Sequence, residues 1–183
     1  MSEMQRPWID LPICECGEEL VGLKPFFHCL EPHPYQSVGA PYGNLSDPWR
    51  VRFGVSTRLR LAQEYLKVEH PDLCLAIFDA WRPIPVQAFM VEKLINEHCR
   101  EKGINRNDLN QSFELKEIIK EVGRFWAPPS RDPRNPPPHC TGGAVDLTLA
   151  DSRGIPLDMG GKIDEIGFVS YPNYYLKAAK TDS

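Results

Sequence analysis

The segment PPHCTGGAVDLTL, residues 137–149, sets the strictest condition on the fold because it places an aspartate inside an apolar run. Aspartate is depleted in strands, and a buried carboxylate is costly unless it is paired, hydrogen-bonded or bound to a metal. Side chains alternate along a strand, so one face of AVDLTL is apolar and is expected to be core. That face comprises Val145, Leu147 and Leu149. Asp146 lies on the other face, between a small residue and a hydroxyl, which suits the floor of a cleft.

A histidine precedes this aspartate in the pattern His139-x6-Asp146, and Gly142 and Gly143 between them permit a sharp turn. One imidazole nitrogen and one carboxylate oxygen are two of the three protein ligands that a catalytic zinc ion uses. The same spacing also fits a carboxylate that bonds to backbone amides or to an arginine, so both interpretations stay open. Cys140 is adjacent to His139 and is expected to point elsewhere.

A second polar cluster follows LCLAIF, residues 73–78, a continuous apolar run typical of a strand buried on both faces. Asp79 and Arg82 come directly after it, where active-site loops tend to emerge. The arginine is a candidate for stabilising the oxyanion of a tetrahedral intermediate. A salt bridge between Asp79 and Arg82 that only locks the turn explains the same residues, and this feature by itself favours the salt bridge.

Apolar periodicity predicts three helices. Their expected bounds are 56–68, 85–99 and 114–122. Ser56 is a candidate N-cap of the first helix, and Ile119 is expected on the inward face of the third. Residues 1–50 are rich in Pro, Gly and Asn and are expected to be loops with short strands, such as 19–23. Helices around a small, mostly antiparallel sheet indicate an α+β fold in a single domain over residues 1–183.

Composition narrows the class of protein. The net charge of −4, without a basic block, does not favour nucleic acid as a partner. No apolar run approaches the roughly 20 residues of a membrane span, and the first residues do not resemble a secretory signal, so a cytoplasmic location is expected. The six cysteines form no Cys-x-x-Cys pair and are expected to be free thiols. A small zinc knuckle within 14–29 is an alternative whose spacing fits no common pattern.

Two motifs in order, IFDAWRPIPVQ at residues 77–87 and then PPHCTGGAVDLTL, resemble the zinc D-alanyl-D-alanine dipeptidases. This family includes the vancomycin-resistance dipeptidases and is related to D-Ala-D-Ala carboxypeptidases and hedgehog-like domains. The resemblance runs from about Tyr35 to Tyr175. It implies a metallopeptidase of the same fold, with a small D,D-dipeptide as substrate.

The resemblance assigns roles to four residues. It implies His139 and Asp146 as ligands of one Zn²⁺ per chain, which activates water for the hydrolysis of D-alanyl-D-alanine. It implies Arg82 as the residue that stabilises the transition state through the scissile carbonyl oxygen. Asp79 would hold this arginine in place without binding the metal itself.

Other positions depart from the family or lie outside its implied site. Pro137 and Cys140 stand where the resistance enzymes usually have serine, which leaves the dipeptide preference open. Asp158 and Asp164 lie in a segment similar to the family and are expected to be turn and loop residues, not ligands.

The resemblance also implies a C-terminal Glu-x-x-His, whose glutamate is the general base and whose histidine is the third zinc ligand. No Glu-x-x-His occurs in the 183 residues, so neither role is assigned and the chain is expected to be C-terminally incomplete relative to the family. The remaining histidines are not expected to be ligands. They are His28 and His33, in the N-terminal loops, and His70 and His98, expected at solvated helix ends.

Two further expectations follow from this difference. A missing general base typically costs about 10²–10⁴-fold in rate, so the alternative function is an impaired member that binds peptidoglycan-type D,D-peptides without cleaving them. A sheet that lacks its closing strand has an exposed edge, which predicts self-association.

Overall fold

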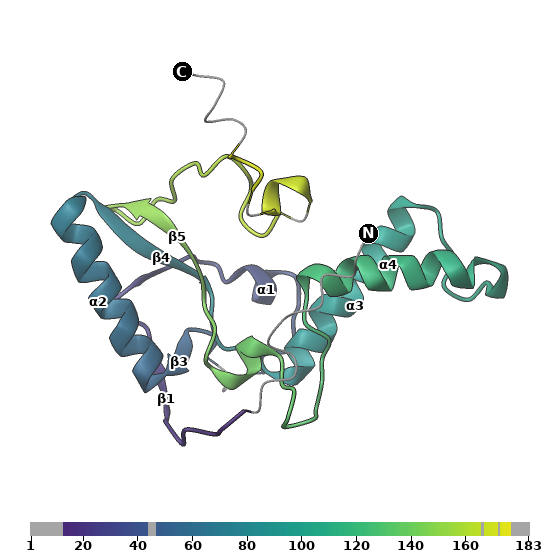
Figure 1. Ribbon diagram of the computed structural model, residues 1–183, viewed down its shortest axis with the longest axis horizontal. Coiled ribbons are helices and arrows are strands. Elements are labelled where there is room, and N and C mark those ends of the chain that lie inside the picture. The colour runs from purple at the N-terminus through teal and green to yellow at the C-terminus, as the bar shows by residue number, and fades with distance from the viewer. Residues whose placement is uncertain (1–12, 44–46, 166, 172, 177–183) are drawn as a thin grey trace.

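The computed structural model describes residues 13–43, 47–165, 167–171 and 173–176 (Figure 1). The strands are β1 (Leu20–Gly22), β2 (His28–Cys29), β3 (Arg50–Arg52), β4 (Leu73–Asp79) and β5 (Asp146–Asp151). The α-helices are α1 (Pro34–Ser37), α2 (Phe53–Glu69), α3 (Ile84–Glu101) and α4 (Ser112–Phe125). The 3-10 segments are η1 (Leu109–Gln111), η2 (Pro138–Thr141) and η3 (Phe168–Ser170). This combination confirms the predicted α+β class.

The strands form two small sheets. β4 is the centre of a three-stranded sheet in the order β2-β4-β5, parallel to β2 and antiparallel to β5. β1 and β3 form a separate antiparallel pair. The apolar run at 73–78 is buried as expected, and Ala76 and Ile77 are both 0% exposed. Two of the three strand pairs in the described residues are antiparallel, as predicted, and the three-stranded sheet itself is mixed.

One irregularity in β4 sets the geometry of the polar residues. The pairing with β5 runs in step from Leu73 opposite Asp151 to Ile77 opposite Leu147, and then shifts so that Asp79 lies opposite Asp146. An extra residue in one strand is a β-bulge, which re-aims the side chains that follow it. Residues directly opposite each other share a face of the sheet. The shift therefore brings the two carboxylates to the same side.

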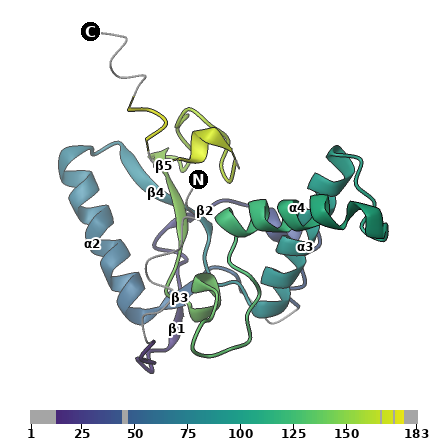
Figure 2. The same ribbon diagram turned by 45° about the vertical axis from the view of Figure 1, so that its right-hand side comes forward.

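Helix α2 covers one face of this sheet (Figure 2), with Leu59 packed in one cluster with Leu75 and Ile77. The helix begins at Phe53, so the expected N-cap at Ser56 is wrong. The amide of Gly54 instead donates to Glu18 Oε2 at 2.7 Å. A carboxylate from a distant segment thus satisfies the helix N-terminus, which carries free N–H groups and a positive partial charge.

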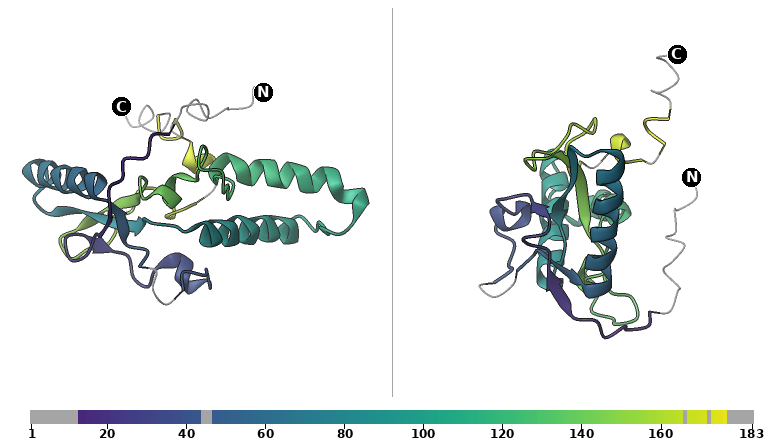
Figure 3. Two further views of the ribbon diagram at one scale, coloured as in Figure 1. Left: turned by 90° about the horizontal axis from the view of Figure 1, so that it is seen from below. Right: turned by 90° about the vertical axis from the view of Figure 1, so that its left-hand side faces the viewer.

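Helices α3 and α4 run side by side as a hairpin that extends away from the sheet (Figure 3). Val86 and Met90 of α3 pack with Ile118 and Val122 of α4 in the larger core cluster. Ile119 is 46% exposed, so its expected inward position is wrong. It lies about 100° around the helix from Ile118, outside the stripe that contacts α3. Among the described residues, no helix combines the length and hydropathy that crossing a membrane requires.

The apolar face of β5 is only partly buried. Val145 and Leu149 pack beside the core cluster of α2 and β4. Leu147 is 41% exposed, so its expected position in the core is wrong. The reason is that β5 lies at the edge of its sheet. Within the described part of the chain, the outer side of β5 bonds only to residues 155–157, at its far end.

Candidate metal centre

Two aspartates from neighbouring strands form the base of the site. Asp79 ends β4 and Asp146 begins β5, and the register shift places them opposite each other. Their environments differ: the Asp79 side chain is 0% exposed and that of Asp146 is 45% exposed. One carboxylate is therefore enclosed by protein, and the other is open to a ligand.

His139 reaches the same point from η2. Its Nδ1 lies 2.8 Å from the carbonyl oxygen of Ala80, which can only accept a hydrogen bond. Nδ1 therefore carries a proton, and Nε2, which has a lone pair when the ring is neutral, lies 3.4 Å from Asp146 Oδ2. The turn that follows needs glycine at Gly142, where φ is +72° and a Cβ atom would lie 2.3 Å from Leu20 Cδ2.

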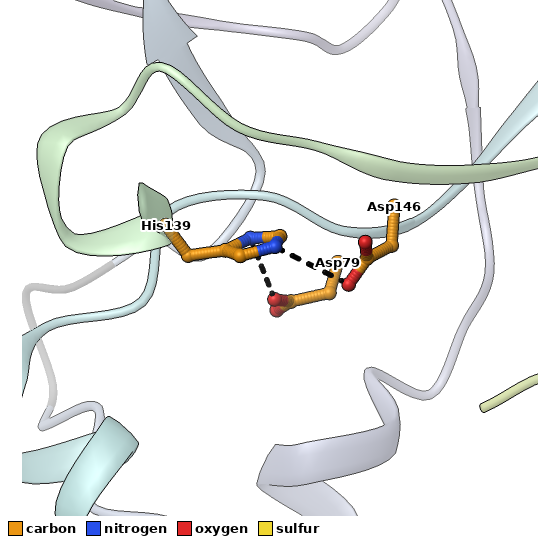
Figure 4. Close-up of side chains that lie close together, drawn as sticks. All are labelled: Asp79, His139 and Asp146. Carbon is orange, nitrogen blue, oxygen red and sulfur yellow. Dashed lines mark ion pairs between the residues drawn. The ribbon is translucent and has the colours of Figure 1, made fainter. Parts of the chain in front are cut away.

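These three side chains converge from three segments of the chain (Figure 4). Asp79, His139 and Asp146 each offer one nitrogen or oxygen atom, and all three atoms lie within 4.8 Å of one another. Burial alone would lower the pKa of His139, but the hydrogen bond and charge of Asp146 outweigh it and raise this pKa. The Asp146 carboxylate therefore favours the protonated form of the imidazole. The cluster has the composition of a metal-binding site.

Asp79 is already saturated with protein partners. Its Oδ1 accepts from His33 Nε2 at 3.1 Å and from the Tyr42 hydroxyl at 3.3 Å. Its Oδ2 accepts from Arg82 at 3.1 Å (Nε) and 2.7 Å (Nη2), and lies 3.3 Å from His139 Nδ1. Burial alone would raise the pKa of Asp79, yet the hydrogen bond from His33 and the charge of Arg82 together lower it. This carboxylate is ionised and organises its neighbours.

Arg82 is held on every side. Besides the Asp79 contacts, its Nη1 donates to Gln87 Oε1 at 2.9 Å. The guanidinium carbon lies 5.0 Å from the ring centroid of Tyr35 and 4.5 Å from that of Trp126. Nη2 also lies 3.6 Å from Asp146 Oδ2, the oxygen nearest His139 Nε2. The structure thus fixes a positive charge beside the histidine–aspartate pair.

A third aspartate closes the far side of the site. Asp164 has a positive φ of 63° and accepts a hydrogen bond from the Tyr35 hydroxyl through Oδ2 at 3.0 Å. Desolvation of its carboxyl group, followed by the charge of Asp146, raises the pKa of Asp164. The sequence prediction of a loop position is confirmed, and Asp164 is not part of the candidate metal cluster.

A pocket of about 620 Å³ opens beside Asp146 along β5. Most of its lining is apolar, and the segment after β5 supplies one wall. The residues with polar or charged side chains in the lining are Asp146, Thr148, Lys162 and Asp164. A small ligand in this pocket would lie against the open carboxylate of the site.

The sequence-predicted residues come together, and several partners were not predicted. His139, Asp146, Arg82 and Asp79 form one cluster, and the salt bridge between Asp79 and Arg82 is present. His33 was expected in a loop without a role, but it is 3% exposed and bonds to Asp79. Its partner lies far away in sequence, so no local pattern could have identified it.

The other histidines and the cysteines complete the comparison. His70 is exposed as expected. His98 lies in the last turn of α3 but is half-buried, and its buried Nδ1 has no hydrogen-bond partner among the described residues, so it is less solvated than expected. All six cysteines are free thiols. Among the described residues, no cluster of metal-ligating groups forms around Cys14, so the alternative of a zinc knuckle is not supported. Cys140 lies outside the metal cluster, and burial raises the pKa of its thiol to about 11.

Comparisons with known proteins identify the family of the chain. The family described as D-ala-D-ala dipeptidase matches residues 29–182. A D-alanyl-D-alanine dipeptidase from Synechocystis is 42% identical over 175 residues, which cover 93% of this chain and 68% of that relative. No solved structure matches the chain. Because the match extends over most of the chain and includes both sequence motifs, this protein belongs to the D-Ala-D-Ala dipeptidase family.

Proposed function

We propose that this protein hydrolyses D-alanyl-D-alanine as a zinc-dependent dipeptidase. The observation that carries the proposal is the convergence on Asp146 Oδ2, which lies 3.4 Å from His139 Nε2 and 3.6 Å from Arg82 Nη2. A metal-binding pair and a fixed positive charge are thereby adjacent at one side of a pocket. Family membership and the name of the 42% identical relative support the same reaction.

The donor set fits a single zinc ion. Zinc binds histidine nitrogen and carboxylate oxygen, and a catalytic site keeps a position open for water or substrate. In the neutral ring of His139 the proton lies on Nδ1, which donates to Ala80, so Nε2 can bind zinc, and Asp146 is open to solvent. A bound zinc ion lowers the pKa of a water molecule and polarises a carbonyl group.

Arg82 and Asp79 act on either side of this pair. The Arg82 guanidinium stabilises the negative charge that develops on the scissile carbonyl oxygen, and it needs no reorganisation because Asp79, Gln87 and two rings already hold it. Asp79 orients both Arg82 and His139. Such partners behind metal ligands raise ligand basicity and fix ring orientation.

Asp79 is a weaker candidate for the third ligand than its distance suggests. Both of its oxygens already accept hydrogen bonds: a metal at Oδ1 would compete with His33, and a metal at Oδ2 would compete with Arg82. The sequence contains no Glu-x-x-His, so we assign neither a general base nor a third ligand to these residues.

The pocket suits a small zwitterion. D-alanyl-D-alanine carries one ammonium group, one carboxylate and two methyl groups. The lining offers apolar surface, the carboxylate of Asp164 for an ammonium group and Lys162 for a carboxylate. We propose that the dipeptide lies along β5 with its scissile bond at Asp146.

Zinc titration against a competing chelator tests the metal site. We expect wild-type protein to bind one zinc ion and His139→Ala to lose that binding. His70→Ala, at an exposed position outside the site, is the matched control and should bind as wild type does. Equal affinity in wild type and His139→Ala would refute the metal site.

Release of D-alanine from D-alanyl-D-alanine, with L-alanyl-L-alanine as control, tests the reaction. We expect release that depends on added zinc and that Arg82→Ala abolishes. Protein that retains zinc and binds the D,D-dipeptide but releases no D-alanine would instead support the alternative of a binding protein that no longer cleaves.

A further inference from the structure

His33 is buried at the centre of the site although it touches neither candidate ligand. Its side chain is 1% exposed, and its ring is packed against three aromatic rings. The ring centroids of Tyr35, Tyr42 and Trp49 lie 5.6, 5.1 and 4.6 Å away. A side chain confined in this way has one orientation available.

The backbone around His33 determines which nitrogen carries its proton. Nδ1 lies 3.2 Å from the amide nitrogen of Tyr35 and 3.4 Å from that of Gln36, and both amides donate to it as the N-cap contacts of α1. A nitrogen that accepts hydrogen bonds has no proton of its own. The proton therefore lies on Nε2, which donates to Asp79 Oδ1 at 3.1 Å.

The two oxygens of the Asp79 carboxylate contact different partners. Oδ1 is held by His33 and Tyr42, and Oδ2 faces Arg82 and His139. A carboxylate can rotate about its last torsion, so a contact at Oδ1 also fixes Oδ2. Without His33, the longer contact to the Tyr42 hydroxyl, at 3.3 Å, would be the one hydrogen bond left on that side from the described residues.

We propose that His33 is a positioning residue for the metal site, acting through Asp79 on both His139 and Arg82. The inference rests on the proposed function, since it gives the network a metal ion and a substrate to organise. The Nε2–H group of His33 holds Oδ1 of Asp79 in place. The orientation of the carboxylate is thereby fixed, so that Oδ2 faces Arg82 and His139.

Two substitutions separate positioning from a purely structural role. His33→Gln places an amide NH₂ group near the position of Nε2 and retains the donor to Asp79, but loses the cap of α1. His33→Asn retains a good N-cap acceptor and is too short to reach Asp79. A structural role in capping predicts that Asn preserves function, whereas positioning predicts that Gln does.

We expect His33→Asn to weaken zinc affinity about tenfold, near the lower end for partners behind metal ligands, and His33→Gln to stay within about twofold of wild type. His70→Asn is the control for a histidine substitution at an exposed site. In an Asp79→Asn background, His33→Asn should have no further effect on affinity, because its route to the metal is gone.

A measurement without metal makes the outcome independent of the proposed function. Crystal structures of metal-free His33→Asn and His33→Gln should show a rotated Asp79 carboxylate, or a displaced Arg82, in the first variant only. An unmoved Asp79 and Arg82 in His33→Asn, or a larger effect of Gln than of Asn, would overturn the inference. If wild-type protein fails to bind zinc, the proposed metal site is wrong, and the crystal structures still decide the role of His33.

Discussion

The two aspartates that face each other across β4 and β5 have the same chemistry and opposite surroundings. Asp79 is fully buried and accepts hydrogen bonds from His33, Tyr42 and Arg82, whereas Asp146 has a side chain that is 45% exposed. Nothing in their residue type distinguishes them. Position in the sheet does: β4 is the central strand and β5 lies at the edge.

This difference explains how one sheet supplies both an organising group and a candidate ligand. A buried charge is stable only when paired, so Asp79 is committed to its neighbours. Asp146, on the edge strand, is half-exposed and lines the pocket. Substitutions at the two positions should therefore separate protein stability from metal binding.

The largest effect is expected from Asp79→Asn. Removing this charge takes away the nearest counter-ion of the buried Arg82 and leaves the longer contact to Asp146, so we expect a loss of about 3–5 kcal/mol in the free energy of unfolding. Urea denaturation followed by circular dichroism measures it. A loss below about 1 kcal/mol would mean that the buried pair is not structural.

Asp146→Asn should have the opposite profile. The side chain is half-exposed, so we expect the free energy of unfolding without metal to stay within about 0.5 kcal/mol of wild type. Zinc affinity should fall by about 100-fold, because a ligand of the ion should count for at least as much as the groups behind the ligands, whose loss costs up to about 100-fold. Paired urea and zinc titrations check this, and an unchanged zinc affinity would remove Asp146 from the site.

Lowering the pH should reproduce part of the loss in unfolding free energy that is expected for Asp79→Asn. The pKa of Asp79 is lowered in the folded protein, so its contribution to stability is present above the unfolded pKa of about 3.9. It is lost as the pH falls through the lower folded value. Unfolding free energy measured from pH 6 to pH 2 should thus fall less steeply in Asp79→Asn than in wild type. Identical slopes would contradict the lowered pKa.

The edge position of β5 also predicts weak self-association. Leu147 is 41% exposed on a strand at the edge of its sheet, a surface prone to pairing with another chain. Sedimentation velocity over a concentration series should show association that Leu147→Lys reduces. Ile119→Lys, which alters an apolar side chain of similar exposure on α4, is the matched control.

The smallest expected effect is a difference in alkylation rate between buried and exposed cysteine thiols. Burial raises the pKa of Cys29 and Cys140 to about 11, so both remain protonated at pH 8. Cys14 and Cys16 are exposed. Alkylation followed by mass spectrometry should label Cys14 and Cys16 first, and the labelling of Cys29 and Cys140 should accelerate as the pH rises towards 11.

Local patterns in the sequence predicted the main helices and strands. Features that depend on contacts between distant segments could not be predicted in this way. The apolar run of β4 and the stripes of α3 and α4 are visible because burial repeats with the period of a strand or a helix. The N-terminus of α2 was misplaced because its capping carboxylate, Glu18, belongs to another segment. The same reason hides His33, whose partner Asp79 lies 46 positions away.

The register shift between Ile77 and Asp79 makes the site depend on chain length as well as on residue identity. With an even pairing, Phe78 would lie opposite Asp146 and Asp79 would point to the other face of the sheet, although every side chain of the site would still be encoded. The connection between α3 and α4, in contrast, can gain or lose residues far from the carboxylates. Insertions and deletions in relatives should therefore be frequent in the hairpin and nearly absent from the end of β4.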